Sequence, residues 1–145
     1  MESSGRANVL VVANRTAATP ALLDAVRARA EESPAQFHLV VPDPAHDHLR
    51  HPHDHSAGDK ALALALPLIR EAADGHADGS VSIRHDPMDA IEETLRAGDF
   101  DEIILSTLPR HVSHWLHLDL PSRVAHLGLP LTTVVAGERE ESSVA

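Results

Sequence analysis

The stretch Val9-Leu-Val-Val-Ala13 is the apolar run that decides the fold of this chain of 145 residues. Five consecutive apolar residues, without alternation, are typical of a strand that is buried on both faces. Strands of this kind occupy the middle of parallel sheets, because helices cover both faces of such sheets. The run therefore predicts the central strand of a parallel α/β sheet.

Similar short runs recur along the chain, and stretches with helical spacing separate them. Leu22, Val26 and Ala30 recur every four residues, which places them on one face of a helix. Two helical stretches begin with a capping residue and a proline, at Thr19-Pro20 and Asp86-Pro87. We predict strands at residues 9–13, 37–41, 80–84, 100–105 and 131–135, and helices from residue 20, at 60–74, from residue 87 and at 120–127.

One proline and two glycines indicate where these helices bend or end. Pro67 lies inside the 60–74 stretch, where it predicts a kink or a late start. Gly98 is expected to end the third helix in a left-handed conformation. Gly128 is expected to end the last one.

The alternation of strands and helices predicts a single three-layer α/β domain over residues 8–136, with a five-stranded parallel sheet. The polar segments 1–7 and 137–145 are expected to be flexible. Ligands of such sheets bind beyond the carboxyl ends of the strands, near the point where the strand order reverses. The candidate ligand-binding residues at those ends are Asn14, Arg15, Thr16, Val41, Asp86, Ser106, Thr107 and Arg110.

Composition excludes several classes of protein. The formal net charge is −10 and the 12 Lys and Arg residues form no stripe, which argues against a nucleic-acid partner. The absence of cysteine excludes disulfides, thiol catalysis and thiolate zinc sites. The early apolar run is too short for a signal peptide or a membrane span, so we expect a cytoplasmic protein.

Sequence motifs for catalysis are missing as well. The residues after the first strand, Asn14-Arg-Thr-Ala-Ala-Thr-Pro20, contain neither a phosphate-binding loop nor a dinucleotide fingerprint. The serine-hydrolase motif Gly-x-Ser-x-Gly occurs nowhere in the chain. We therefore expect a binding or signalling protein that is not an enzyme and has no cofactor.

Four stretches resemble the universal stress protein family. The family's last third is similar to Ile103-Ile-Leu-Ser-Thr-Leu-Pro-Arg110 and to Pro121-Ser-Arg-Val-Ala-His-Leu-Gly-Leu-Pro-Leu-Thr-Thr-Val-Val135. Asp86-Pro-Met-Asp-Ala-Ile-Glu-Glu93 and Asp99-Phe-Asp-Glu-Ile-Ile104 resemble its third helix entry and its approach to the fourth strand. The resemblance implies a Rossmann-like fold of the adenine nucleotide alpha hydrolase type. It also implies a homodimer that pairs through Leu131 to Val135.

The chain departs from this family at the phosphate-binding residues. ATP-binding members use Gly-x2-Gly-x9-Gly-Ser/Thr, because backbone amides must approach the phosphates. Counting back from Arg123-Val124 without gaps, these positions are Leu105, Leu108, Leu118 and Asp119, and Asn14 replaces the family's aspartate. The resemblance therefore implies a regulatory or stress-response module that does not bind ATP in the family's manner.

Two alternatives remain open. One is an unidentified small molecule or nucleotide held by the loops after the first and fourth strands. The other is weak metal binding, because imidazoles beside carboxylates can hold Zn²⁺ or Ni²⁺. The candidate ligands for that metal are His46, His48, His51, His53 and His55.

Other histidines have simpler interpretations. A mobile, solvated loop explains the cluster at residues 46–55 without any metal. His111, His114 and His117 flank Trp115, and packing of Trp115 against the domain is favoured over a lid or a partner contact. His85 could act as a base, but its sequence neighbours include no nucleophile.

Overall fold

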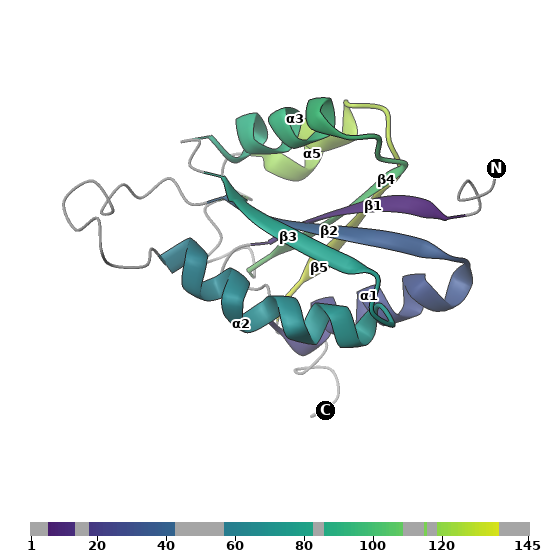
Figure 1. The fold of residues 1–145 in the computed structure, drawn as a ribbon. Helices are drawn as coiled ribbons and strands as arrows, with labels where there is room; N and C mark the ends of the chain where they lie inside the picture. Colours follow the sequence, from purple (N-terminus) through teal and green to yellow (C-terminus); the bar gives the residue numbers. More distant parts are fainter. Residues whose placement is uncertain are drawn as a thin grey trace, which may run out of the picture.

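The computed structural model describes residues 6–13, 18–42, 57–82, 86–108, 115 and 119–136. Within them, five strands alternate with four helices, as the sequence predicted (Figure 1). The strands are β1 (Ala7–Val12), β2 (Ala35–Pro42), β3 (Ala77–Ser82), β4 (Glu102–Thr107) and β5 (Leu131–Val135). The helices are α1 (Pro20–Glu32), α2 (Ala57–Ala72), α3 (Pro87–Ala97) and α5 (Leu120–Ala125).

The strands form one parallel sheet in the order β3-β2-β1-β4-β5. β1 lies in the middle, where Val11 is paired with Leu39 of β2 and with Ile104 of β4. The strand order reverses between β1 and β4, because the chain first builds outward from β1 to β3 and then returns to the other side. This reversal places the expected ligand-binding edge beyond the carboxyl ends of β1 and β4.

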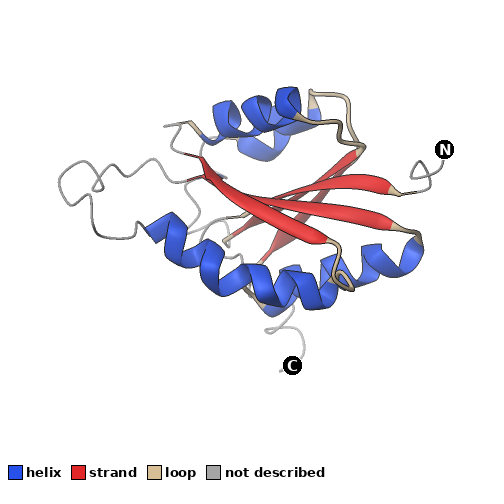
Figure 2. Ribbon diagram, in the orientation of Figure 1, coloured by secondary structure: helices blue, strands red, loops and turns tan. Residues whose placement is uncertain are grey.

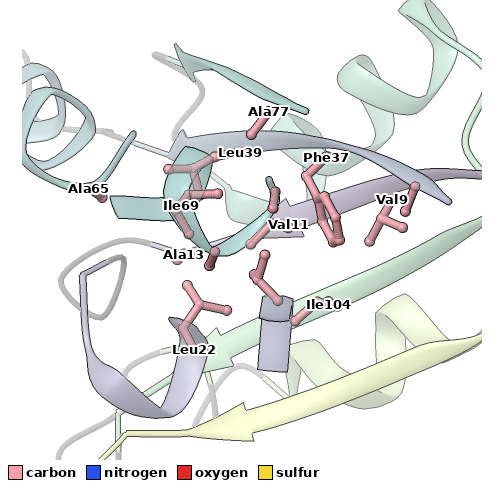
Figure 3. Close-up of a cluster of buried hydrophobic side chains, with 14 of the residues drawn as sticks. Val9, Val11, Ala13, Leu22, Phe37, Leu39, Ala65, Ile69, Ala77 and Ile104 are labelled. Atoms are coloured by element: carbon pink, nitrogen blue, oxygen red, sulfur yellow. The ribbon is translucent and has the colours of Figure 1, made fainter. Parts of the chain in front are cut away.

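Helices cover both faces of the sheet, with α1 and α2 on one face and α3 and α5 on the other (Figure 2). Val9, Val11 and Ala13 pack with Leu22 and Phe37 on the α1/α2 face (Figure 3). Leu10 and Val12 pack on the opposite face, because successive side chains of a strand point in opposite directions. Residues 9–13 are all fully buried, which confirms the prediction of a central strand.

The ends of the helices follow the predicted capping signals in part. Asp86 precedes α3, and its Oδ1 accepts a hydrogen bond of 2.9 Å from the backbone N–H of Met88. Thr19 occupies the cap position of α1, but its side chain makes no capping hydrogen bond. α2 continues through Pro67, so the predicted late start is wrong. None of the described helices is long and apolar enough to cross a membrane.

Two other local predictions are corrected by the structure. Gly98 has φ of −145°, which is extended backbone and not the left-handed conformation. A Cβ at this position would lie 3.2 Å from the ring of Phe100, so the glycine leaves room for that ring. β3 begins at Ala77, three residues before the predicted start, because Ala77 pairs with Phe37 and belongs to the core.

Candidate functional site

Thr107 lies at the carboxyl end of β4, next to the point where the strand order reverses. Its side chain is 2 % exposed, and its Oγ1 has no hydrogen-bond partner among the described residues. Its carbonyl oxygen accepts a hydrogen bond of 2.8 Å from the N–H of Ala136. A buried hydroxyl without a partner costs about 1–3 kcal/mol, so this group is a donor and acceptor whose hydrogen-bonding capacity the described residues leave unused.

Ser106 is buried beside it, with 1 % of its surface exposed. The two side chains point to opposite faces of the sheet, because neighbouring residues of a strand alternate. Ile104 packs on the α1/α2 face and Leu105 on the α3/α5 face, so Ser106 faces the first pair of helices and Thr107 the second. One ligand on one face can therefore reach only one of these hydroxyls.

Asp86 and Arg123 form an ion pair that connects the start of α3 to α5. The Nη2 of Arg123 donates to the Oδ2 of Asp86 across 3.1 Å, and the Oδ1 accepts from Met88. Burial of the carboxyl opposes its ionisation. The hydrogen bonds from Met88 and Arg123, with the positive charge of Arg123, outweigh burial and lower the pKa of Asp86 below its usual value. Because both oxygens are engaged, Asp86 acts as a cap and a pairing residue.

Val41 is the fourth candidate that the structure describes. It is fully buried and packs in the core between the sheet and the α1/α2 helices. Its side chain therefore fills the core and does not line the carboxyl edge.

The remaining candidates lie outside the described residues. They are Asn14, Arg15, Thr16, Arg110, His85, the histidines His46, His48, His51, His53 and His55, and His111, His114 and His117. Trp115 is described, and it packs partly buried against the α3/α5 core cluster, as the sequence predicted. Within the part of the chain that the structure covers, no three His, Asp or Glu side chains are arranged to hold a metal ion.

Two positions that the ungapped count assigns to the family's phosphate-binding motif have different environments here. Leu105 is inside β4 and fully buried, so its side chain belongs to the core and not to a loop. Asp119, at the position of the motif's Ser/Thr, has φ of 58° and ψ of 36°, which is the left-handed conformation. The chain has no glycine between Gly98 and Gly128. A shift in the alignment therefore cannot restore a glycine to this segment.

A hollow of about 440 Å³ lies at the opposite edge of the sheet, before the amino ends of β2 and β3. Its lining carries charges of both signs, from Arg6, Glu31, Glu32 and Asp74. Ligands of open α/β sheets bind at the other edge, so this hollow is not the candidate site.

Three polar side chains that the sequence did not single out meet on β2 and β3. The Nδ1 of His38 lies 2.7 Å from the Oδ1 of Asp78, and its Nε2 lies 3.0 Å from the Oγ of Ser80. The ring of Phe100 lies beside His38, with 6.3 Å between the ring centroids. No sequence motif predicts this group of side chains, because their contacts depend on how β2 and β3 pair.

The site and the sheet order define a class of protein: a five-stranded parallel α/β module whose ligand edge lies between β1 and β4. No protein-family model matches the chain, and no curated protein does. The universal stress protein from Archaeoglobus fulgidus is similar in structure, with a TM-score of 0.65 and 14 % sequence identity over 92 % of this chain and 96 % of that one.

A second structure of the Archaeoglobus fulgidus universal stress protein, in complex with dAMP, has a TM-score of 0.60 and 15 % identity over 90 % of this chain and 98 % of that chain. The chain therefore has the fold of the universal stress proteins. The resemblance in the third helix entry and the last third of the sequence is confirmed at the level of the fold.

Proposed function

We propose that the chain is a universal-stress-protein-like binding module of the regulatory or stress-response type, and that it does not hold ATP through a glycine loop. The observation that carries the second part is the absence of glycine between Gly98 and Gly128, a stretch that includes β4 and the connection from β4 to α5. Backbone amides can surround phosphates only where no Cβ stands in the way. Likeness of fold supports the first part.

The charged side chains at the carboxyl edge of the sheet also support the proposal that the chain does not hold ATP. Arg123, which belongs to the Arg-Val pair that resembles the family's, is already bonded to Asp86. Asp119 precedes α5 and takes the motif's Ser/Thr position in the ungapped count, so its carboxylate would repel a phosphate held there. With a net charge of −10 on the whole chain, a triphosphate must overcome repulsion at long range as well.

Thermal unfolding in the presence of nucleotides tests the proposal. A ligand at 100 times its Kd adds about 2.7 kcal/mol to the free energy of unfolding. We expect no shift of Tm with ATP or dAMP at millimolar concentration, with or without Mg²⁺. A rise of Tm with ATP that saturates would contradict the proposal.

A second candidate function is the binding of a different small molecule at the β1/β4 edge. The buried Oγ1 of Thr107, without a partner among the described residues, favours it. The dAMP complex of the Archaeoglobus fulgidus protein makes a nucleoside monophosphate one class of ligand to examine. Native mass spectrometry of the purified protein tests this candidate, because a retained ligand adds a defined mass. A bare polypeptide mass, with no response to any nucleotide, would count against it.

We also propose that the module forms a homodimer through β5. This strand is at the edge of the sheet, where one side of its backbone has no strand partner among the described residues. Thr132 and Thr133 are exposed on it. Sedimentation velocity at high micromolar concentration should give a dimer, and Thr132→Lys should weaken it through charge repulsion across a two-fold contact. A monomer at that concentration would contradict this part of the proposal.

A further inference from the structure

Ser80, His38 and Asp78 have the hydrogen-bond order of a serine-hydrolase triad. The carboxylate contacts one nitrogen of the imidazole at 2.7 Å, and the hydroxyl contacts the other nitrogen at 3.0 Å. In such triads the hydroxyl is the nucleophile, the imidazole removes its proton, and the carboxylate orients the ring. We propose that Ser80 is an activated nucleophile that is acylated by small, neutral carboxylic esters, independently of the site at the carboxyl edge.

The pairing of β2 with β3 builds this group. His38 is opposite Asp78 in the register of the two parallel strands, and Val40 is opposite Ser80. Asp78 and Ser80 are two residues apart on β3, so their side chains project from the same face of the sheet. The ring of His38 projects from that face too and spans the distance between them.

The contacts also fix which nitrogen of His38 acts as the base. A carboxylate can only accept, so the Nδ1 that faces Asp78 carries the proton. The Nε2 then presents its lone pair to the hydroxyl of Ser80. Phe100 packs at 52° to the imidazole ring and restricts its rotation. The base is therefore held in one tautomer and one orientation, as acid–base catalysis requires.

Exposure and charge define the substrate class. Ser80 is exposed, and the side chains of His38 and Asp78 are 25 % and 64 % exposed, so a reagent can approach the hydroxyl from solvent. The nearby carboxylate of Asp78 repels anionic substrates. β3 is an edge strand, and the N–H groups on its outer side, which no described strand pairs with, can donate to a developing oxyanion. Small uncharged esters fit these conditions.

The reaction has two steps. The Oγ of Ser80 attacks the ester carbonyl carbon, its proton passes to the Nε2 of His38, and the alcohol leaves after it receives that proton. The product is an acyl-serine ester. A water molecule, deprotonated by the same Nε2, then attacks the acyl carbon, so that the acid is released and the hydroxyl of Ser80 is restored.

The test uses a fluorophosphonate ester, because histidine itself is a nucleophile. The chain has 12 histidines, and their background reaction obscures the hydrolysis of nitrophenyl esters in bulk. With the fluorophosphonate, a P–O bond to Ser80 forms, a P–F bond breaks, fluoride leaves and the proton goes to His38. Peptide mass spectrometry locates the stable adduct. We expect labelling at Ser80 and none at Ser33, whose Oγ accepts a hydrogen bond from Arg29.

Variants separate a reactive serine from an exposed one. Ser80→Ala should abolish the adduct. His38→Gln should slow labelling by about 10² to 10⁴, the usual contribution of a general base. Asp78→Asn should also slow it, since the positioning carboxylate is lost, while the unfolding midpoint stays close to that of the wild type. Equal labelling of Ser80 and Ser33, or an unchanged rate in a folded His38→Gln variant, would overturn the proposal.

Discussion

Arg123 of α5 donates to Asp86 at the start of α3 across 3.1 Å, and this ion pair connects the two helices on one face of the sheet at its carboxyl edge. The arginine that resembles the family's Arg-Val pair therefore has a structural role in this chain. Asp86 holds the N–H of Met88 with its other oxygen. Because Asp86 neutralises the charge of Arg123, this arginine is not a free cation for an anionic ligand at the carboxyl edge.

We expect Asp86→Ala to lower the free energy of unfolding by about 1 kcal/mol at pH 7, because α3 loses its cap. The pKa of Asp86 is lower in the folded chain than in the unfolded one, so the stabilisation is complete above the unfolded pKa and disappears as pH falls through the folded one. Urea unfolding at a series of pH values should therefore show that the free energies of unfolding of the wild type and the alanine variant converge below about pH 4.

Asp86→Asn is the matched control for that measurement. Asparagine keeps an acceptor for the N–H of Met88 and removes the charge that pairs with Arg123. The loss should be smaller, because the ion pair is more than one-third exposed on both sides and water screens it. A deficit in the alanine variant that is equal at pH 7 and pH 3 would contradict the assigned role.

Thr107→Val should raise the stability of the ligand-free protein by about 1 kcal/mol, because it removes a buried hydroxyl that lacks a partner among the described residues. Thr107→Ser keeps the hydroxyl and should show no gain. Thermal and urea unfolding measure both variants. A loss of stability in Thr107→Val would mean that the hydroxyl is engaged in the wild type.

Leu105→Ala should cost about 2–5 kcal/mol in the free energy of unfolding. Leu105 is fully buried against the α3/α5 helices, although an ungapped count places the first phosphate-loop glycine at this position. Urea unfolding should show the lower midpoint with an unchanged slope. A cost under about 1 kcal/mol would indicate that the side chain is not a core residue.

Gly128→Ala should destabilise the chain by about 1 kcal/mol, because Gly128 has φ of 90° and nothing lies within 4 Å to complicate the substitution. Gly98→Ala meets no such backbone strain, since Gly98 is extended, and only the Phe100 ring must move slightly. Comparing the unfolding midpoints of the two variants tests this. A larger loss at Gly98 than at Gly128 would contradict the assignment of their conformations.

Most of the fold could be predicted from residue spacing. The fully apolar stretch Val9–Ala13 identified the central strand, and Asp86-Pro87 identified the start of α3 correctly. The beginning of β3 was missed, because Ala77-Asp-Gly79 has the composition of a turn. Pairing with β2 makes this stretch a strand, and pairing is a tertiary effect that local composition does not contain.

The sequence could predict only those site residues whose place at the end of a strand made them candidates. Asp86 and Thr107 were candidates because they follow the predicted third and fourth strands, but the partners of their side chains depend on packing. His38 lies 40 residues from Asp78 in the sequence. Only the register of two parallel strands brings these side chains together, and the sequence does not specify that register.

Isothermal titration calorimetry with ATP and Mg²⁺ tests the central claim most directly. Because the segment between β4 and α5 has no glycine, we expect the titration to give only the heat of dilution at millimolar ATP. Saturable heat with one ATP per chain, reduced by substituting Thr107, would show that this edge binds a triphosphate by other means, and the account given for it would be wrong.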